Sequence, residues 1–109
     1  MRNAKTVDAD ASEAVFQDAV IRIAKMRGWE CFHPKPHQIR ANVWRSDGRG
    51  FPDLTMAREG RIIFAELKTA KGNLSVDQKK WLFHLSASKN AEVYVWRPAD
   101  LEKIAEILA

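Results

Sequence analysis

Apolar residues recur along the chain with two different periods, one typical of helices and one of strands. Helical spacing predicts a first helix over residues 12–28, capped by Asp10 or Ser12. A second helix is predicted over residues 75–88. A last helix follows Pro98 and carries an apolar stripe formed by Leu101, Ile104, Ala105 and Leu108.

Short runs of β-forming residues predict four strands, at residues 29–33, 53–58, 61–68 and 92–96. The stretch over residues 37–50 is expected to be irregular, with brief pairing over residues 41–44. The order helix, three strands, helix, strand, helix predicts an α/β fold in which the second helix joins two parallel strands by a right-handed crossover. We expect a flexible tail over residues 1–11 and a single domain over residues 12–109.

The two middle strands form a predicted hairpin, because only Glu59 and Gly60 separate them. Pairing residue by residue back from this turn places Asp53 opposite Glu66, and strand alternation puts Lys68 on the same face. Opposed carboxylates about 5 Å apart at Cβ repel each other unless a positive charge lies between them. The hairpin therefore predicts a divalent-cation site, unless a β-bulge shifts the register by one.

Each of these residues also has an ordinary structural interpretation. Asp53 at a strand start is often a turn former, and Lys68 at a strand end is often a solvated lysine. Glu66 is harder to explain in this way, because it lies within an otherwise apolar strand and an unpaired buried carboxylate is costly. The presence of all three on one face favours the cation site.

Two helical residues are candidates to complete the site. Glu13 precedes Phe16 by three residues and is expected on the inward face of the first helix, although it also fits a capping box with Asp10. Gln78 is expected to face inward from the second helix and forms a capping-box pattern with Ser75. A capping role and a site role are compatible, because the cap fixes where the side chain starts.

Composition narrows the class of protein. The chain has 109 residues, of which 46% are hydrophobic and 29% charged, and this excludes a disordered chain. Apolar runs are far shorter than the roughly 20 residues needed to cross a bilayer. No apolar segment follows Arg2 and Lys5, so we expect no secretory signal and no membrane, and a lone Cys31 suits a reducing cytoplasm.

Charge is concentrated in the middle of the chain. The formal net charge is +4, and residues 22–49 hold seven basic residues against two acidic ones. This distribution favours a polyanionic partner, although a solvated face of ordinary charges would look the same. Among the tryptophans, Trp29, Trp44, Trp81 and Trp96, core packing is the favoured interpretation over base stacking, least so for Trp44 in the basic stretch.

A spaced motif connects these features. It comprises Gly50 to Asp53, then Glu66 to Lys68, then Ser75 to Gln78. This motif resembles the VRR-NUC domain, a family of the PD-(D/E)xK nuclease superfamily, and the likeness extends from about residue 12 to residue 96. The chain departs from the family pattern after His33, where residues 34–37 replace a loop that contains Gly or Asn.

The resemblance implies a restriction-endonuclease-like fold, with an αβββαβ core, a mixed four-stranded sheet flanked by helices and a C-terminal helix. It implies that Mg²⁺ or Mn²⁺ is held by Asp53, Glu66 and the backbone carbonyl of Leu67. Lys68 would be the catalytic lysine and Gln78 a supporting glutamine. The implied helix acid is Glu13, acting through a second ion or a coordinated water.

The same resemblance implies a DNA endonuclease, structure-specific on branched DNA such as Holliday junctions, of the small phage or bacterial type, acting as a homodimer in the cytoplasm of a bacterium or an infected host. A nicking or flap nuclease and a catalytically silent DNA-binding module are the alternatives. DNA phosphates are expected to contact Arg40, Arg45, Arg49, Lys71 and His33. The apolar stripe of the last helix and the tryptophan-bearing strand before it are the expected dimer surface, unless this helix covers the sheet of its own chain.

Overall fold

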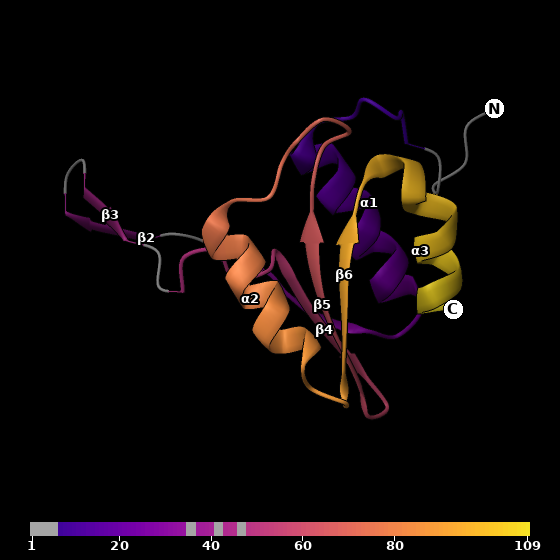
Figure 1. Cartoon of the computed structure of the whole chain (residues 1–109). Helices are drawn as coiled ribbons and strands as arrows, with labels where there is room; N and C mark the ends of the chain where they lie inside the picture. The colour runs from indigo at the N-terminus through magenta and orange to yellow at the C-terminus, as the bar shows by residue number, and fades with distance from the viewer. Residues whose placement is uncertain (1–6, 35–36, 41–42, 46–47) are drawn as a thin grey trace.

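The computed structural model of the protein describes residues 7–34, 37–40, 43–45 and 48–109, and between residues 37 and 45 it describes the backbone alone. Figure 1 shows the arrangement of the elements. In chain order they are α1 (Glu13–Met26), β1 (Glu30–Phe32), β2 (His37–Arg40), β3 (Val43–Arg45), β4 (Leu54–Arg58), β5 (Arg61–Leu67), α2 (Val76–Ser86), β6 (Ala91–Trp96), a 3-10 turn η1 (Pro98–Asp100) and α3 (Leu101–Leu108).

A four-stranded sheet in the order β1-β4-β5-β6 forms the centre of the fold. The β1–β4 and β4–β5 pairs are antiparallel, and β5 runs parallel to β6 because α2 connects them. The mixed sheet, its flanking helices and the C-terminal helix confirm the αβββαβ architecture expected from the sequence.

The turn between β4 and β5 sets the register of the hairpin. Glu59 and Gly60 both have positive φ, 47° and 85°, as a type I′ turn requires. Residues then pair in the predicted register from Arg58 opposite Arg61 back to Leu54 opposite Ala65. No bulge interrupts these five pairs, so Asp53 precedes β4 in the position that continues the register toward Glu66.

The β2–β3 hairpin corrects the expectation of an irregular stretch. The two strands pair antiparallel in a separate two-stranded sheet, with a register shift between Gln38 and Arg40. Figure 1 draws this hairpin to one side of the main sheet. Ile39, Val43 and Trp44 are residue types that favour extended backbone, which accounts for two regular strands where the sequence predicted only brief pairing over residues 41–44.

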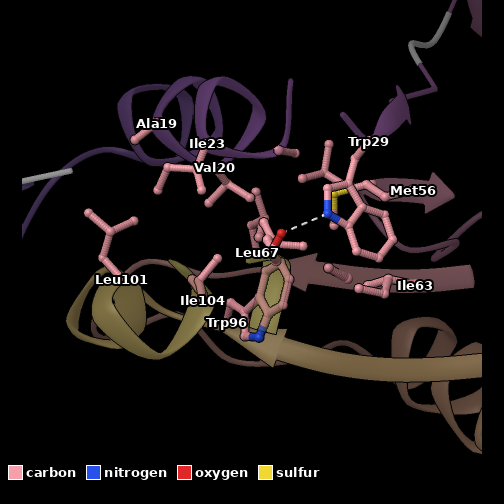
Figure 2. Close-up of a cluster of buried hydrophobic side chains, with 14 of the residues drawn as sticks. Ala19, Val20, Ile23, Trp29, Met56, Ile63, Leu67, Trp96, Leu101 and Ile104 are labelled. Atoms are coloured by element: carbon pink, nitrogen blue, oxygen red, sulfur yellow. Dashed lines mark hydrogen bonds between the residues drawn. The ribbon is translucent and has the colours of Figure 1, made fainter. Parts of the chain in front are cut away.

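The apolar core lies between α1, α3 and one face of the sheet (Figure 2). The indole Nε1 of Trp29 donates a hydrogen bond to the Leu108 carbonyl, 2.9 Å away, and this bond ties the end of α3 to the start of β1. Arg58 lies over the Trp29 ring and its guanidinium donates to the carbonyls of Arg27, Leu108 and Ala109. Partly buried Val7 also packs against this core.

The dimer surface expected on the last helix is wrong. Leu101 is 6% exposed, and Ile104 and Leu108 are fully buried, because α3 covers the core of its own chain beside α1. Trp96, on the strand before it, is 2% exposed. This helix therefore presents no apolar stripe for self-pairing. None of the helices in the described ranges is long and apolar enough to cross a membrane.

The turn geometry generates a prediction for stability. Glu59 adopts a left-handed conformation that costs most L-residues about 1–2 kcal/mol, whereas Asn tolerates it. Its ion pair with Arg58 is 3.9 Å long and largely exposed, so it contributes little. We expect Glu59→Asn to raise the free energy of unfolding by about 0.5–1 kcal/mol in urea titrations. Glu59→Ala removes the same charge without relieving the backbone, and an equal gain from it would refute the argument.

Candidate active site

Glu66 is the charged residue that the described part of the chain buries, at 2% exposure. Its neighbours Ala65 and Leu67 face the apolar core, so strand alternation turns Glu66 toward α2 on the opposite face. There Gln78 Nε2 donates to Glu66 Oε2 at 2.7 Å. Lys68 Nζ lies 3.6 Å from the same oxygen, with 15% of its side chain exposed. Two contacts thus fix one carboxylate oxygen.

Asp53 lies beside this carboxylate at the start of β4. Its Oδ2 accepts a hydrogen bond from the backbone N–H of Leu67 at 2.8 Å. That bond anchors the side chain to the end of β5 and keeps it next to Glu66. Asp53, Glu66, Lys68 and Gln78 therefore lie together, as the hairpin register predicts. The structure gives the Leu67 amide a role in the site, and a role for its carbonyl stays a prediction.

The electrostatics of the site centre on one proton. Burial above all, together with the charge and hydrogen bond of Asp53, raises the pKa of Glu66 from 4.5 to about 8. The negative charge of Glu13 acts in the same direction, whereas Lys68 lowers this pKa. In the absence of a cation, Glu66 therefore keeps a proton at neutral pH, and a divalent cation would take that proton's place.

Gln78 has the dual role that its position allows. Its Oε1 accepts from the Ser75 backbone N–H at 2.8 Å, and its own N–H donates to Ser75 Oγ at 3.1 Å. This capping box starts α2 and fixes the side chain, so that Nε2 points at Glu66. The same Gln78 side chain therefore caps α2 and supports the Glu66 carboxylate.

A glycine and an aromatic cluster set the distance between α2 and the hairpin. Gly50 has a φ of 84°, and a Cβ there would lie 2.5 Å from the Asp77 carbonyl carbon and 2.7 Å from the Gln78 nitrogen. The loop thus packs directly on the start of α2. Next to it, Phe51 makes edge contacts with Phe64 and Trp81, with centroids 5.9 and 4.9 Å apart. The motif contained Gly50, but only the structure shows its packing role.

Arg97 is a positioning residue that sequence reasoning missed. Its Nη1 donates to the carbonyls of Thr69 and Gly72, at 2.6 and 2.8 Å. These bonds hold the loop that follows Lys68 against the end of β6. The sequence gives no indication of this contact. The partners are backbone carbonyls, which every residue has, and they lie 28 and 25 residues away in the chain.

Glu13 differs from its expected placement. It is the first residue of α1 and is exposed, since Ser12 caps the helix and the buried stripe begins only at Phe16. Its charge still reaches Glu66. Within the described ranges, no three His, Cys, Asp or Glu side chains are placed to hold a metal ion together. The charge of Glu13 thus acts on Glu66 from an exposed position, and its role through a second ion or a coordinated water stays a prediction.

The expected DNA-contacting residues are only partly described. Arg49 and Lys71 are exposed, and His33 is half-buried. Arg40 and Arg45 belong to β2 and β3, but their side chains fall outside the described part of the chain. The expectation that most tryptophans are core residues holds for Trp29 and Trp96, at 3% and 2% exposure.

The donor set fits a hard divalent cation. Two adjoining carboxylates, one of them buried with a strongly raised pKa, would carry more negative charge than Lys68 offsets once both are deprotonated, as they are when a cation displaces the proton. Magnesium is commonly held by one or two carboxylates, with water or phosphate oxygens completing its coordination. Asp53 and Glu66 supply such a pair without a third carboxylate.

No family model, curated protein or solved structure matches the chain. What the site can do therefore follows from the positions and charges of Asp53, Glu66, Lys68 and Gln78.

The buried proton predicts an unusual pH dependence. A carboxyl group with a raised folded-state pKa binds a proton up to about pH 8, whereas the unfolded chain releases it near pH 4.5. The unfolded state thus holds fewer protons in this window, and stability falls as pH rises. In EDTA, we expect the free energy of unfolding to drop by about 2–4 kcal/mol between pH 5 and pH 8.5. Glu66→Gln should flatten this slope, and an unchanged slope would exclude Glu66 as its source.

The close approach of Gly50 to α2 predicts a second effect. Gly50→Ala adds both left-handed strain and a clash with helix backbone, whereas Gly60→Ala, at a φ of 85°, adds the strain alone because nothing lies within 4 Å. We expect Gly60→Ala to cost about 1–2 kcal/mol and Gly50→Ala about 1–3 kcal/mol more. Urea unfolding of the two variants measures the difference. Equal costs would show that the loop does not position α2 through this contact.

Proposed function

We propose that the protein is a metal-dependent DNA endonuclease that hydrolyses phosphodiester bonds, with branched DNA as its substrate. The observation that carries this proposal is the buried Glu66 carboxylate, held by Gln78 beside Asp53 and Lys68. A purely structural acid in a strand needs no second carboxylate beside it, whereas Glu66 lies next to Asp53, whose charge helps to raise its pKa.

Asp53, Glu66 and the Leu67 carbonyl are the groups that would hold Mg²⁺ or Mn²⁺. When bound there, the cation supplies charge neutralisation for a phosphate and makes a water molecule more acidic. The protein contributes rigidity: the Leu67 N–H orients Asp53, and Gln78 orients Glu66. Exposed Glu13 adds negative potential that favours the approach of a cation.

Lys68 is placed to act on the reacting phosphate. Its ammonium lies 3.6 Å from Glu66 and retains access to solvent. From there it can donate to a phosphate oxygen or orient the attacking water as charge develops. The loop after it, which carries exposed Lys71, is held by Arg97. Lys71 and Arg49 would neutralise neighbouring phosphates, a contribution that weakens with salt. A homodimer would supply the two incisions that a four-way junction needs.

Two variants separate binding from turnover. Labelled linear, flap and four-way DNA is incubated with Mg²⁺ or Mn²⁺, and divalent binding is measured as a thermal shift at pH 8.5. We expect Glu66→Ala to lose both the metal-induced shift and cleavage. Lys68→Ala should keep the shift and the DNA affinity but lower the single-turnover rate at least about 100-fold.

The matched controls are exposed residues of the same charge. Lys71→Ala removes a lysine three residues from Lys68, and Glu102→Ala removes an exposed acid on α3. We expect Lys71→Ala to change salt dependence with little effect on single-turnover rate, and Glu102→Ala to change neither. Cleavage by Glu66→Ala within a few fold of the unmodified protein would overturn the site. Loss of DNA affinity in Lys68→Ala at a preserved rate would make Lys68 a phosphate anchor.

A further inference from the structure

A hollow on the surface of α2 is not used by the proposed metal site. Its volume is about 260 Å³, and it is lined by Lys80, Trp81 and His84. Trp81 is half-buried, unlike Trp29 and Trp96, which lie in the core. An indole that lines a surface hollow offers a flat apolar area to a ligand.

The Trp81 ring is held in place before any ligand arrives. Its Nε1 donates to the Arg49 carbonyl at 3.1 Å. Phe51 also contacts the ring edge-on, with ring centroids 4.9 Å apart and planes at 82°. A ring fixed in this way loses little conformational freedom on binding, so its contact area is available at low entropic cost.

The charge around the hollow selects the class of ligand. Lys80 and His84 line it, and His84 is positioned by an edge contact with Phe83 at 5.3 Å. Among the residues that the structure describes, those that line it include no acidic side chain. A flat apolar surface next to the ammonium of Lys80 suits a ligand that is aromatic in one part and anionic in another. A nucleotide has this composition, with a π face that stacks and a phosphate that pairs with lysine.

The hollow is close to the proposed cleavage site. Trp81 follows Gln78 by three residues, so the two side chains are one turn apart, about 5 Å along α2. A chain of ring contacts also leads from Trp81 through Phe51 to Phe64, which lies two residues before Glu66 on the same face of β5. A strand whose phosphate lies at Glu66 would pass beside this ring.

We infer that the hollow binds an unpaired nucleobase stacked on Trp81, with Lys80 at an adjoining phosphate. Rings inside a base-paired stack are covered above and below, so only a base outside the duplex exposes a face to the indole. The inference rests on the proposed nuclease function and narrows its substrate to DNA with unpaired nucleotides next to the cleaved bond.

The test measures binding without catalysis. Fluorescence anisotropy in EDTA compares a labelled dT octamer with an octamer of abasic residues, which keeps every phosphate but has no bases. We expect the unmodified protein to prefer the dT octamer by about tenfold or more, as stacking of one base implies. Trp81→Leu, which retains apolar contact with Phe51, should bind both oligonucleotides equally. The comparison of the two octamers on the unmodified protein changes the DNA and not the protein. It therefore tests base stacking even if Trp81→Leu folds poorly.

A matched pair of lysines tests the phosphate contact. Lys80→Ala and Lys79→Ala remove equal charge from adjacent exposed positions, but only Lys80 lines the hollow. We expect Lys80→Ala to weaken dT octamer binding about threefold more than Lys79→Ala at low salt. Equal losses would overturn the role of Lys80.

The outcomes separate this inference from the proposed function. Equal affinity of the unmodified protein for dT and abasic octamers would overturn base stacking, whatever the cleavage result, and would leave a protein segment as the better occupant of the hollow. A tenfold preference that Trp81→Leu abolishes would support the stacking site. Absence of cleavage in the same preparations would then count against the nuclease alone, since the binding assay contains no divalent cation.

Discussion

Burying a carboxylate is costly unless other groups compensate for the lost water, and Glu66 imposes this constraint on its whole surroundings. Gln78 supplies a hydrogen bond, Lys68 a charge, and Asp53 shares a proton with it. Each partner comes from a different part of the chain, so the hairpin, the loop before β4 and the start of α2 must all be in place together. Removing Gln78 would leave a carboxylate oxygen unsatisfied, and removing Lys68 would leave the ionised carboxylate without its compensating charge.

The two faces of the sheet are stabilised in different ways. The face toward α1 and α3 is apolar and fully packed, and it is closed by the hydrogen bond of Trp29 to Leu108. The opposite face is covered by α2, a helix in which no residue is buried. That helix is attached through Gln78, through the close approach of Gly50 and through the contacts of Trp81. Because no side chain of α2 is buried, α2 is expected to open at a lower free energy than α1 and α3, which cover the apolar face.

Local signals made much of the fold predictable. The Glu59-Gly60 turn determined the register and therefore the meeting of Asp53 with Glu66, and Ser12 and Ser75 marked where helices begin. What the sequence could not show depends on distant partners. The exposure of Glu13 follows from where α1 meets the sheet. Contacts of arginines with backbone carbonyls, as at Arg97, depend on tertiary placement and have no residue pattern.

The β2–β3 hairpin enters the fold between two strands that pair directly with each other. Phe32 at the end of β1 lies opposite Thr55 in β4, so the sheet closes across the insertion without using any of its residues. The entropic cost of a connecting segment rises only with the logarithm of its length. The chain between β1 and β4 can therefore lengthen, shorten or change its charge during evolution while the carboxylate pair stays in register. Changes in the β2–β3 insertion can therefore be selected without altering the Asp53–Glu66 pair at the β4–β5 hairpin.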